Sequence, residues 1–73
     1  MRRKNLKIFR VEHDLTQFDI ASRIGCSRDA YSAIENGSRD PSYDFMEKLQ
    51  TAFDVPAEKM WTLLEREKNE SKK

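Results

Sequence analysis

One short turn constrains the fold of this chain more than any other feature of its sequence. Gly25 follows the last apolar residue of a helical pattern over residues 17–24, and Ser27, only two residues later, is a good N-cap for a second pattern over residues 28–36. Glycine adopts the left-handed conformation at a helix end without strain, because it has no Cβ. A connection this short cannot fold the two helices back antiparallel, so they are predicted to meet at a steep angle.

The rest of the chain reads as three more helices and no strand. Apolar residues recur at helical spacing over residues 4–13, 43–53 and 57–66. No stretch alternates apolar and polar residues or is rich in β-branched residues, as a strand would be. The predicted fold class is therefore all-α, a compact domain of five helices in which the steeply angled pair comes second and third.

The length of 73 residues leaves room for one domain. We expect this domain to span residues 1–66, because residues 67–73 contain no apolar side chain and are typical of a polar, disordered tail. Hydrophobic types make up 37% of the chain, which is enough for a small core whose stability depends on regular packing.

Several classes of function lack the sequence features that they need. The longest run of apolar residues is two, which excludes a membrane-spanning helix and favours a cytoplasmic location. The single cysteine, Cys26, cannot form an internal disulfide, and no Cys/His cluster has metal-ligand spacing. A glycine-rich phosphate loop and a nucleophile elbow are also missing. The chain is therefore predicted not to be an enzyme and to need no cofactor or metal.

Charge is distributed unevenly along the chain, although the net charge is only +1. Residues 1–39 carry 8 basic and 5 acidic side chains, whereas residues 40–73 carry 6 basic and 8 acidic ones. The basic excess begins at Arg2, Arg3 and Lys4. These three form either a basic arm that binds phosphate or a disordered end, and the sequence leaves both interpretations open.

Five short segments stand in a spacing that identifies a family. They are Leu15-Thr16-Gln17, Ile20-Ala21, Ile24-Gly25-Cys26-Ser27, Ile34-Glu35-Asn36-Gly37 and Pro41-Ser42. In these segments, and over about residues 6–61, the chain closely resembles the phage repressor and Cro helix-turn-helix family, also called the XRE family. The resemblance implies a helix-turn-helix at about residues 17–36. Its first helix, the second of the domain, crosses above the DNA backbone, and its second helix, the third of the domain, enters the major groove.

The same resemblance implies a function. Members of this family are sequence-specific regulators of transcription, and a repressor that binds double-stranded DNA as a homodimer on a palindromic operator is the expected form. The expected location is then the bacterial cytoplasm, in association with the nucleoid. No small-molecule effector is expected, because the length leaves no room for a second domain to bind one.

Base reading is assigned by the resemblance to the exposed face of the third helix, namely to Arg28, Asp29, Ser32 and Ala33. Arg28 can present two parallel donors to guanine N7 and O6, and Ser32 can bond either type of base. Asp29 either accepts from a cytosine amine or interacts only with the helix dipole. Ala33 either touches a thymine methyl group or makes no contact.

Phosphate binding is assigned by the resemblance to Gln17, Asn36, Arg39 and Arg10. Gln17 stands at a helix N-terminus, where its side-chain amide and the helix dipole favour the same anion. Asn36 alternatively bonds its own chain at the end of its helix, and Arg39 alternatively is a solvated loop charge. In relatives that carry this pair of residues, Arg10 and Glu35 form a partly buried ion pair that links the first and third helices. From that fixed position, Arg10 either also contacts a phosphate or has only a structural role.

The last helix is the predicted dimer interface. Four apolar residues span more than one of its faces, namely Met60, Trp61, Leu63 and Leu64. One copy of a domain of this size cannot cover all of them, so Met60, Trp61 and Leu64 are expected to contact a second copy. In the alternative, Trp61 caps its own core and dimers form only on DNA.

A different class of function also stays open at this point. An antitoxin or adaptor would use the same domain mainly to bind another protein. Such a protein would need a binding surface beyond the DNA-binding core, and little of this sequence follows residue 66.

Overall fold

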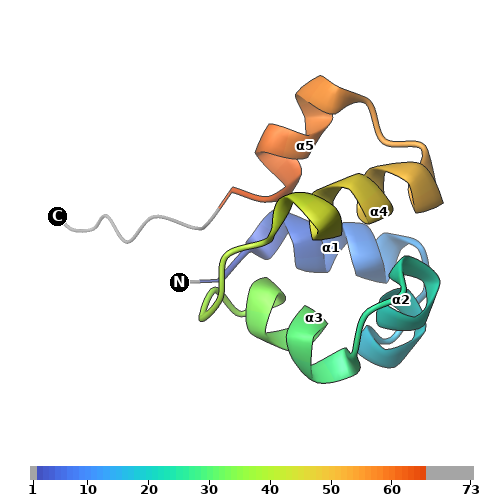
Figure 1. The fold of residues 1–73 in the computed structure, drawn as a ribbon, viewed down its shortest axis with the longest axis vertical. Coiled ribbons are helices and arrows are strands. Elements are labelled where there is room, and N and C mark those ends of the chain that lie inside the picture. The colour runs from blue at the N-terminus through green and yellow to red at the C-terminus, as the bar shows by residue number, and fades with distance from the viewer. Residues whose placement is uncertain (1, 66–73) are drawn as a thin grey trace, which may run out of the picture.

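The structure of this chain, a computed structural model, describes residues 2–65. Within that range it has no strand and five helices (Figure 1): α1 (Lys4–Glu12), α2 (Gln17–Ile24), α3 (Arg28–Glu35), α4 (Tyr43–Phe53) and α5 (Ala57–Leu63). The predicted all-α, five-helix class is confirmed, and α1 and α3 each end one residue earlier than predicted. The prediction of a helix to residue 66 was too long, and the expected tail over residues 67–73 lies outside the described residues. None of the helices in the described range is long and apolar enough to cross a membrane.

Side-chain caps begin three of the helices. The Thr16 hydroxyl accepts from the Asp19 amide at 3.0 Å, and the Asp19 carboxylate accepts from the Thr16 amide at 3.0 Å, which makes a reciprocal capping box. Ser27 and Ser42 accept from the first turns of α3 and α4 in the same way. Gly25 ends α2 with a φ of 90°, so the left-handed turn between α2 and α3 is the one predicted from its glycine.

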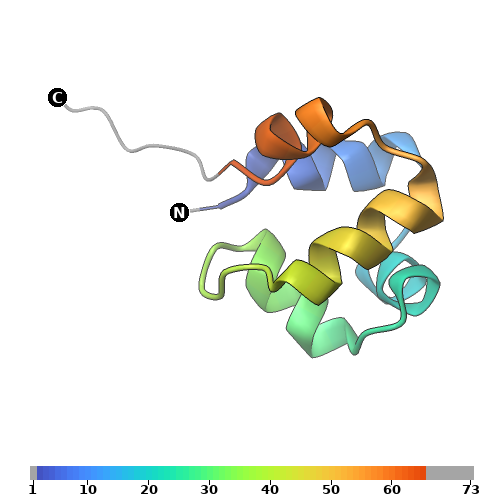
Figure 2. The same cartoon turned by 45° about the horizontal axis from the view of Figure 1, so that its top comes forward.

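One core is shared by all five helices. Its largest fully buried side chains come from α1, α2, α3 and α4, and they are Leu6, Ile20, Tyr31 and Leu49. Met60 and Leu63 add the buried face of α5 to the same cluster. In Figure 2, α4 separates α5 from α2 and α3, so α3 and α5 lie on opposite sides of the molecule.

Arg3 is a buried part of this fold, which corrects the interpretation of the N-terminus drawn from the sequence. Only 3% of the residue is exposed. Its guanidinium donates to acceptors from distant parts of the chain, namely the main-chain carbonyls of Ile34 (2.6 Å), Arg39 (3.0 Å) and Leu64 (2.9 Å) and the carboxylate of Asp40 (3.1 Å). A free basic arm and a disordered end are therefore both wrong for Arg3, which holds the N-terminal segment beside the ends of α3 and α5 (Figure 1).

Candidate nucleic-acid interface

The outward face of α3 carries the four residues predicted to read bases. Arg28 and Asp29 are exposed and Ser32 and Ala33 are half-buried, whereas Tyr31 faces the core. Arg28 Nη1 lies 3.2 Å from Asp29 Oδ1, an ion pair between two exposed side chains. Such pairs contribute at most about 1 kcal/mol, so Arg28 can exchange this partner for another acceptor. The ion pair of Asp29 with Arg28, its neighbour in the chain, was not predicted from the sequence.

Glu35, in the last turn of α3, connects that helix to α1 and α2. Its Oε2 accepts from Arg10 Nε at 2.8 Å and from the Tyr31 hydroxyl at 2.7 Å. Its Oε1 accepts from Gln17 Nε2 at 2.9 Å and from Arg10 Nη2 at 3.3 Å. A carboxylate has about four acceptor positions, so this one is fully used. The Arg10–Glu35 ion pair expected from the sequence is present, within a network that joins three helices.

The electrostatics of this network keep Glu35 charged. Burial raises the pKa of its carboxyl group, but hydrogen bonds from Arg10, Tyr31 and Gln17 outweigh burial, so the pKa of Glu35 lies below its ordinary value of 4.5. The hydrogen bond to Glu35 raises the pKa of Arg10. Burial raises the pKa of the Tyr31 hydroxyl, which therefore remains a donor. The four side chains form a fixed cluster behind the outward face of α3.

A hollow of about 280 Å³ lies beside this cluster. The residues that line it are Arg2, Arg3, Lys7, Arg10, Gln17, Ser32, Glu35 and Asn36. Three of the four predicted phosphate-binding residues therefore meet at one place, next to one of the predicted base-reading residues.

Lys7 also lines this hollow and was not among the residues predicted to bind phosphate. Its side chain is exposed and has no ion-pair partner within residues 2–65. Lys7 and Arg10 are three residues apart in α1, and this spacing places two side chains on one face of a helix. The spacing is therefore the sequence signal that could have identified Lys7.

Gln17 and Asn36 are both partly engaged with the protein. A side-chain amide carries two hydrogens, and Gln17 donates one of them to Glu35, which leaves the second for another acceptor. The Asn36 side-chain oxygen accepts from the Ser38 amide at 3.0 Å and from the Ser38 hydroxyl at 2.7 Å, which is the bond to its own chain that the sequence left open. The Asn36 amide group makes no hydrogen bond within residues 2–65, so each side chain keeps an N–H donor at the hollow.

Arg39 lies apart from the other phosphate-binding candidates. It lines a different hollow, of about 380 Å³, together with Cys26, Asp40 and Lys48. Its side chain is exposed, and its main-chain carbonyl accepts from Arg3. The structure thus does not bring Arg39 to the place where Arg10, Gln17 and Asn36 meet.

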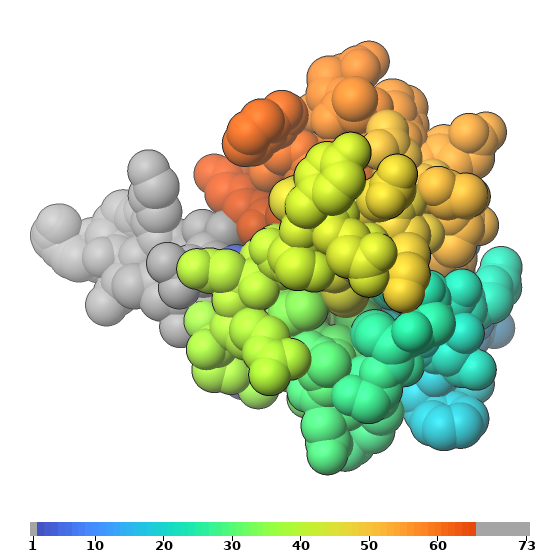
Figure 3. Space-filling view, viewed as in Figure 1, coloured from blue at the N-terminus to red at the C-terminus, as the bar shows by residue number. Residues whose placement is uncertain are grey.

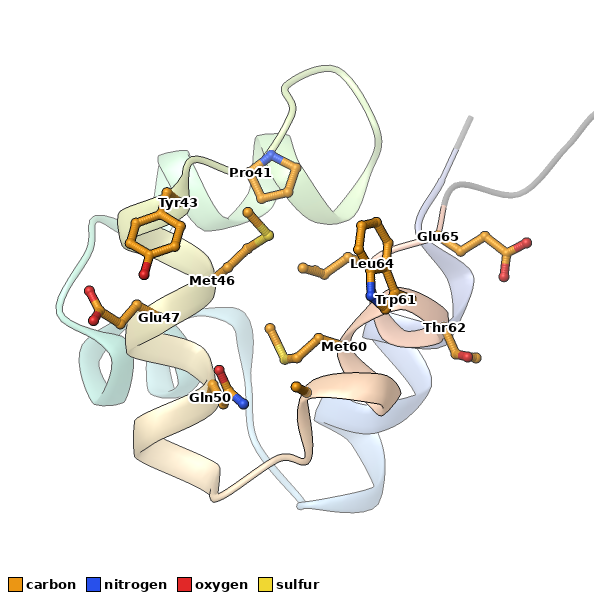
Figure 4. A pocket seen from close by; sticks show the side chains of 11 residues that line it. Pro41, Tyr43, Met46, Glu47, Gln50, Met60, Trp61, Thr62, Leu64 and Glu65 are labelled. Carbon is orange, nitrogen blue, oxygen red and sulfur yellow. The ribbon is translucent and has the colours of Figure 1, made fainter.

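An apolar groove of about 850 Å³ lies between α4 and α5, whose side chains adjoin on the face seen in Figure 3. Its apolar lining consists of Pro41, Tyr43, Met46, Ala57, Met60, Trp61 and Leu64 (Figure 4). Trp61 is 84% exposed, so the alternative in which it caps its own core is wrong. Met60, expected at the surface of an interface, is only 8% exposed and belongs to the core, where it lies beneath the groove. Successive helix positions point about 100° apart, so Trp61 turns outward when Met60 turns inward.

Known proteins resemble this chain over most of its length. The helix-turn-helix family profile matches residues 6–60. The chain is 41% identical over 56 residues to an uncharacterized HTH-type transcriptional regulator of Methanocaldococcus jannaschii, a match that covers 77% of this chain and 85% of that protein. No solved structure gave a significant match.

Two further relatives have names that describe what they do. The chain is 37% identical over 51 residues to the cryptic phage CTXphi transcriptional repressor RstR of Vibrio cholerae, which covers 70% of this chain and 46% of RstR. It is 38% identical over 52 residues to the antitoxin PezA of Streptococcus pneumoniae, which covers 71% of this chain and 33% of PezA. The matched region is thus less than half of either protein.

Proposed function

Because this chain belongs to the helix-turn-helix family of transcriptional regulators, we propose that it represses transcription by binding a palindromic operator as a homodimer, on the nucleoid in the cytoplasm. The observation that carries this proposal is the outward face of α3 next to a hollow lined by donors for phosphate. Similarity to a phage transcriptional repressor supports repression rather than activation.

In the proposed complex, α3 lies in the major groove and the N-terminal end of α2 meets a phosphate strand. Arg28, at the first position of α3, exchanges its exposed pair with Asp29 for two hydrogen bonds to guanine. Asp29 is then available to accept from a neighbouring cytosine. Ser32 and Ala33 stand one turn further along the same face and contact the next bases.

The hollow beside the Glu35 cluster is the proposed phosphate site. Gln17 donates through its second amide hydrogen, and the start of α2 adds the helix dipole. Asn36 donates through its amide group, and Arg10, which Glu35 holds in place, donates through a guanidinium N–H that its bonds to Glu35 and Leu15 leave unused. Arg39 is proposed to bind a different phosphate, from the loop that follows α3.

Selection from a random duplex library tests the proposed function. The expected result is one enriched palindrome whose half-sites are centred about one helical turn, or 34 Å, apart. A library from which no sequence is enriched would contradict specific DNA binding.

Replacing Arg28 with alanine is expected to weaken binding to the selected site by about 1–3 kcal/mol and to relax selectivity at one base pair per half-site, because a contact to a base edge is lost. Replacing Gln17 with alanine is expected to weaken binding to all sequences alike, because a phosphate contact carries no sequence information. The measurement is the affinity of each variant for the selected duplex and for an unrelated one.

Thr51→Ala, at an exposed position of α4, is the control for these two variants and should bind like the wild type. Equal losses on both duplexes in Arg28→Ala would show that Arg28 contacts a phosphate rather than a base. A loss confined to the selected duplex in Gln17→Ala would contradict the phosphate role of Gln17.

The apolar groove between α4 and α5 is the proposed dimer interface. Trp61 and Leu64 of each copy pack onto the groove of the other, with Met60 beneath them. An exposed tryptophan beside an apolar groove is a common sign of a protein interface. Because α5 lies on the opposite side of the molecule from α3, pairing there leaves both copies of α3 uncovered (Figure 2).

The free protein is expected to sediment as a dimer at micromolar concentration. Trp61→Ala and Leu64→Lys should shift it to a monomer, because the first removes the exposed anchor and the second places a charge in an apolar contact. Phe18→Ala is the matched control, since Phe18 is a 67% exposed aromatic residue outside the groove. A wild-type monomer that still binds a palindrome cooperatively would contradict a dimer formed before DNA binding.

A second candidate function is favoured by one comparison. The similarity to the antitoxin PezA supports an antitoxin or adaptor whose groove binds another protein instead of a second copy. The sedimentation experiment separates the two candidates. A wild-type dimer that Trp61→Ala dissociates would assign the groove to self-association.

A further inference from the structure

We propose that the N-terminal segment is a fixed phosphate clamp, in which Arg3 anchors the segment inside the protein and Arg2 binds a DNA phosphate at the hollow. The clamp rests on the proposed function, because the phosphate belongs to DNA. It assigns different roles to two neighbouring arginines that look alike in the sequence.

The Arg3 side chain is buried and bonded to the protein, so it does not contact DNA in the proposed complex. Its guanidinium donates to the carbonyls of Ile34, Arg39 and Leu64 and pairs with Asp40, and only 4% of the side chain is exposed. A guanidinium carries five N–H donors in a rigid fork, and four hydrogen bonds therefore fix both its position and its orientation. The Arg3 main-chain amide adds a further bond, at 2.8 Å, to a carbonyl at the end of α3.

Fixing residue 3 restricts the backbone of Arg2, its neighbour in the chain. The Arg2 side chain is exposed and lines the hollow that Arg10, Gln17 and Asn36 share. Within residues 2–65 it has neither a hydrogen bond nor an ion pair, so its donors are available to a ligand. Arginine presents two parallel N–H donors to a phosphate, which makes a phosphodiester oxygen pair a suitable ligand.

The charge of the hollow also favours an anion. Glu35 is the one carboxylate among the described residues that line it, and donors already fill its acceptor positions. The charges of Arg3 and Arg10 are balanced by ion pairs. Arg2 and Lys7 have no such partner within residues 2–65, so the uncompensated positive charge of the hollow resides on these two exposed side chains.

Salt titrations of operator binding by three variants test the clamp. Loss of one phosphate contact reduces the slope of log K against log salt by about 0.9 for each bound copy, and we expect this loss in Arg2→Ala. Arg3→Lys keeps the charge but cannot occupy four acceptors, so we expect the same loss of slope through a displaced Arg2. Adding Arg2→Ala to Arg3→Lys should reduce the slope no further.

Lys59→Ala is the matched control, because it removes an exposed positive charge from α5, outside the hollow, and should leave the slope unchanged. An unchanged slope in Arg2→Ala would overturn the clamp and leave the proposed function intact. Additive losses in the double variant would overturn the anchoring role of Arg3. A wild-type protein without specific DNA binding would overturn the proposed function itself.

A second measurement, on the wild-type protein, tests the clamp if Arg3→Lys does not fold. The clamp requires the backbone of residues 2 and 3 to be rigid in the free wild-type protein. Backbone ¹⁵N order parameters near about 0.85 are expected there, and values below about 0.6 would overturn the clamp in favour of a flexible arm.

Discussion

Replacing Glu35 with alanine is expected to lower the free energy of unfolding by about 3–5 kcal/mol. The substitution leaves Arg10, whose side chain is only 13% exposed, without its charge partner, and it leaves the buried Tyr31 hydroxyl without its acceptor. A small domain has a total stability of about 5–15 kcal/mol, so a large part of it depends on this one carboxylate. Urea unfolding of the variant and the wild type measures the difference.

Asp44→Ala is the matched control for Glu35→Ala. Asp44 also pairs with a basic side chain, Lys48, but at a site where both are exposed, so its removal should cost less than about 1 kcal/mol. If Glu35→Ala cost no more than this control, the cluster around Glu35 would not be a main source of stability.

Acid provides a second readout for the Glu35 cluster. Because the folded protein holds the pKa of Glu35 below its unfolded value of about 4.5, the carboxylate stabilises the fold above that pH and loses this effect as the pH falls through the lower, folded value. The free energy of unfolding should therefore fall more steeply with acid in the wild type than in Glu35→Gln, which has no group to protonate at this position.

Specific DNA affinity is expected to fall by about 10³–10⁵ between about 50 and 200 mM salt, if the proposed dimer neutralises about 6–10 phosphates. The basis for this number is the exposed basic side chains at the proposed phosphate sites, namely Arg2 and Lys7 at the hollow and Arg39 in the loop after α3, which are six in the dimer. Neutral donors such as Gln17 and Asn36 contact a phosphate without releasing a counterion. Titration of an operator duplex at several salt concentrations measures the slope.

Operators that carry a neutral methylphosphonate at single positions serve as the control for this salt dependence. Each phosphate that the protein contacts should reduce the slope when it is neutralised, and phosphates outside the footprint should not. A flat salt response of the unmodified operator would contradict the phosphate contacts assigned to Arg39 and to the basic side chains of the hollow.

The starts of α2, α3 and α4 and the end of α2 could be predicted because their signals are local. The hydroxyls of Thr16, Ser27 and Ser42 accept from amides only three residues away, and Gly25 adopts its left-handed conformation within the turn that it ends. Signal and effect therefore lie in the same stretch of sequence. The register of the family motifs then indicated which side chains share the outward face of α3.

The role of Arg3 could not be predicted, because three of its acceptors are main-chain carbonyls. Every residue has a carbonyl, so nothing in the sequence distinguishes that of Ile34 or Leu64 from its neighbours. Arg39 is also separated from the hollow that Arg10, Gln17 and Asn36 line. This separation depends on the path of the loop after α3, which the bonds of Arg3 to the Arg39 carbonyl and to Asp40 help to fix.

The division of α5 into a buried and an exposed face was also beyond the sequence. Met60, Trp61, Leu63 and Leu64 are all apolar, so the pattern did not indicate which of them the rest of the chain would cover. Packing against α1 and α4 decides that Met60 and Leu63 turn inward and Trp61 outward.

The hydrogen bond between Arg3 and the Leu64 carbonyl joins residues that the ribosome adds 61 positions apart. A chain under synthesis presents α1, α2 and α3 first, while Arg3 still lacks its last acceptor. The nascent chain therefore completes the hydrogen bonds of Arg3 beside the end of α3 only after α5 has been translated. Because α5 also carries Trp61, the proposed surface for DNA and the proposed surface for a second copy are completed at the same stage of translation.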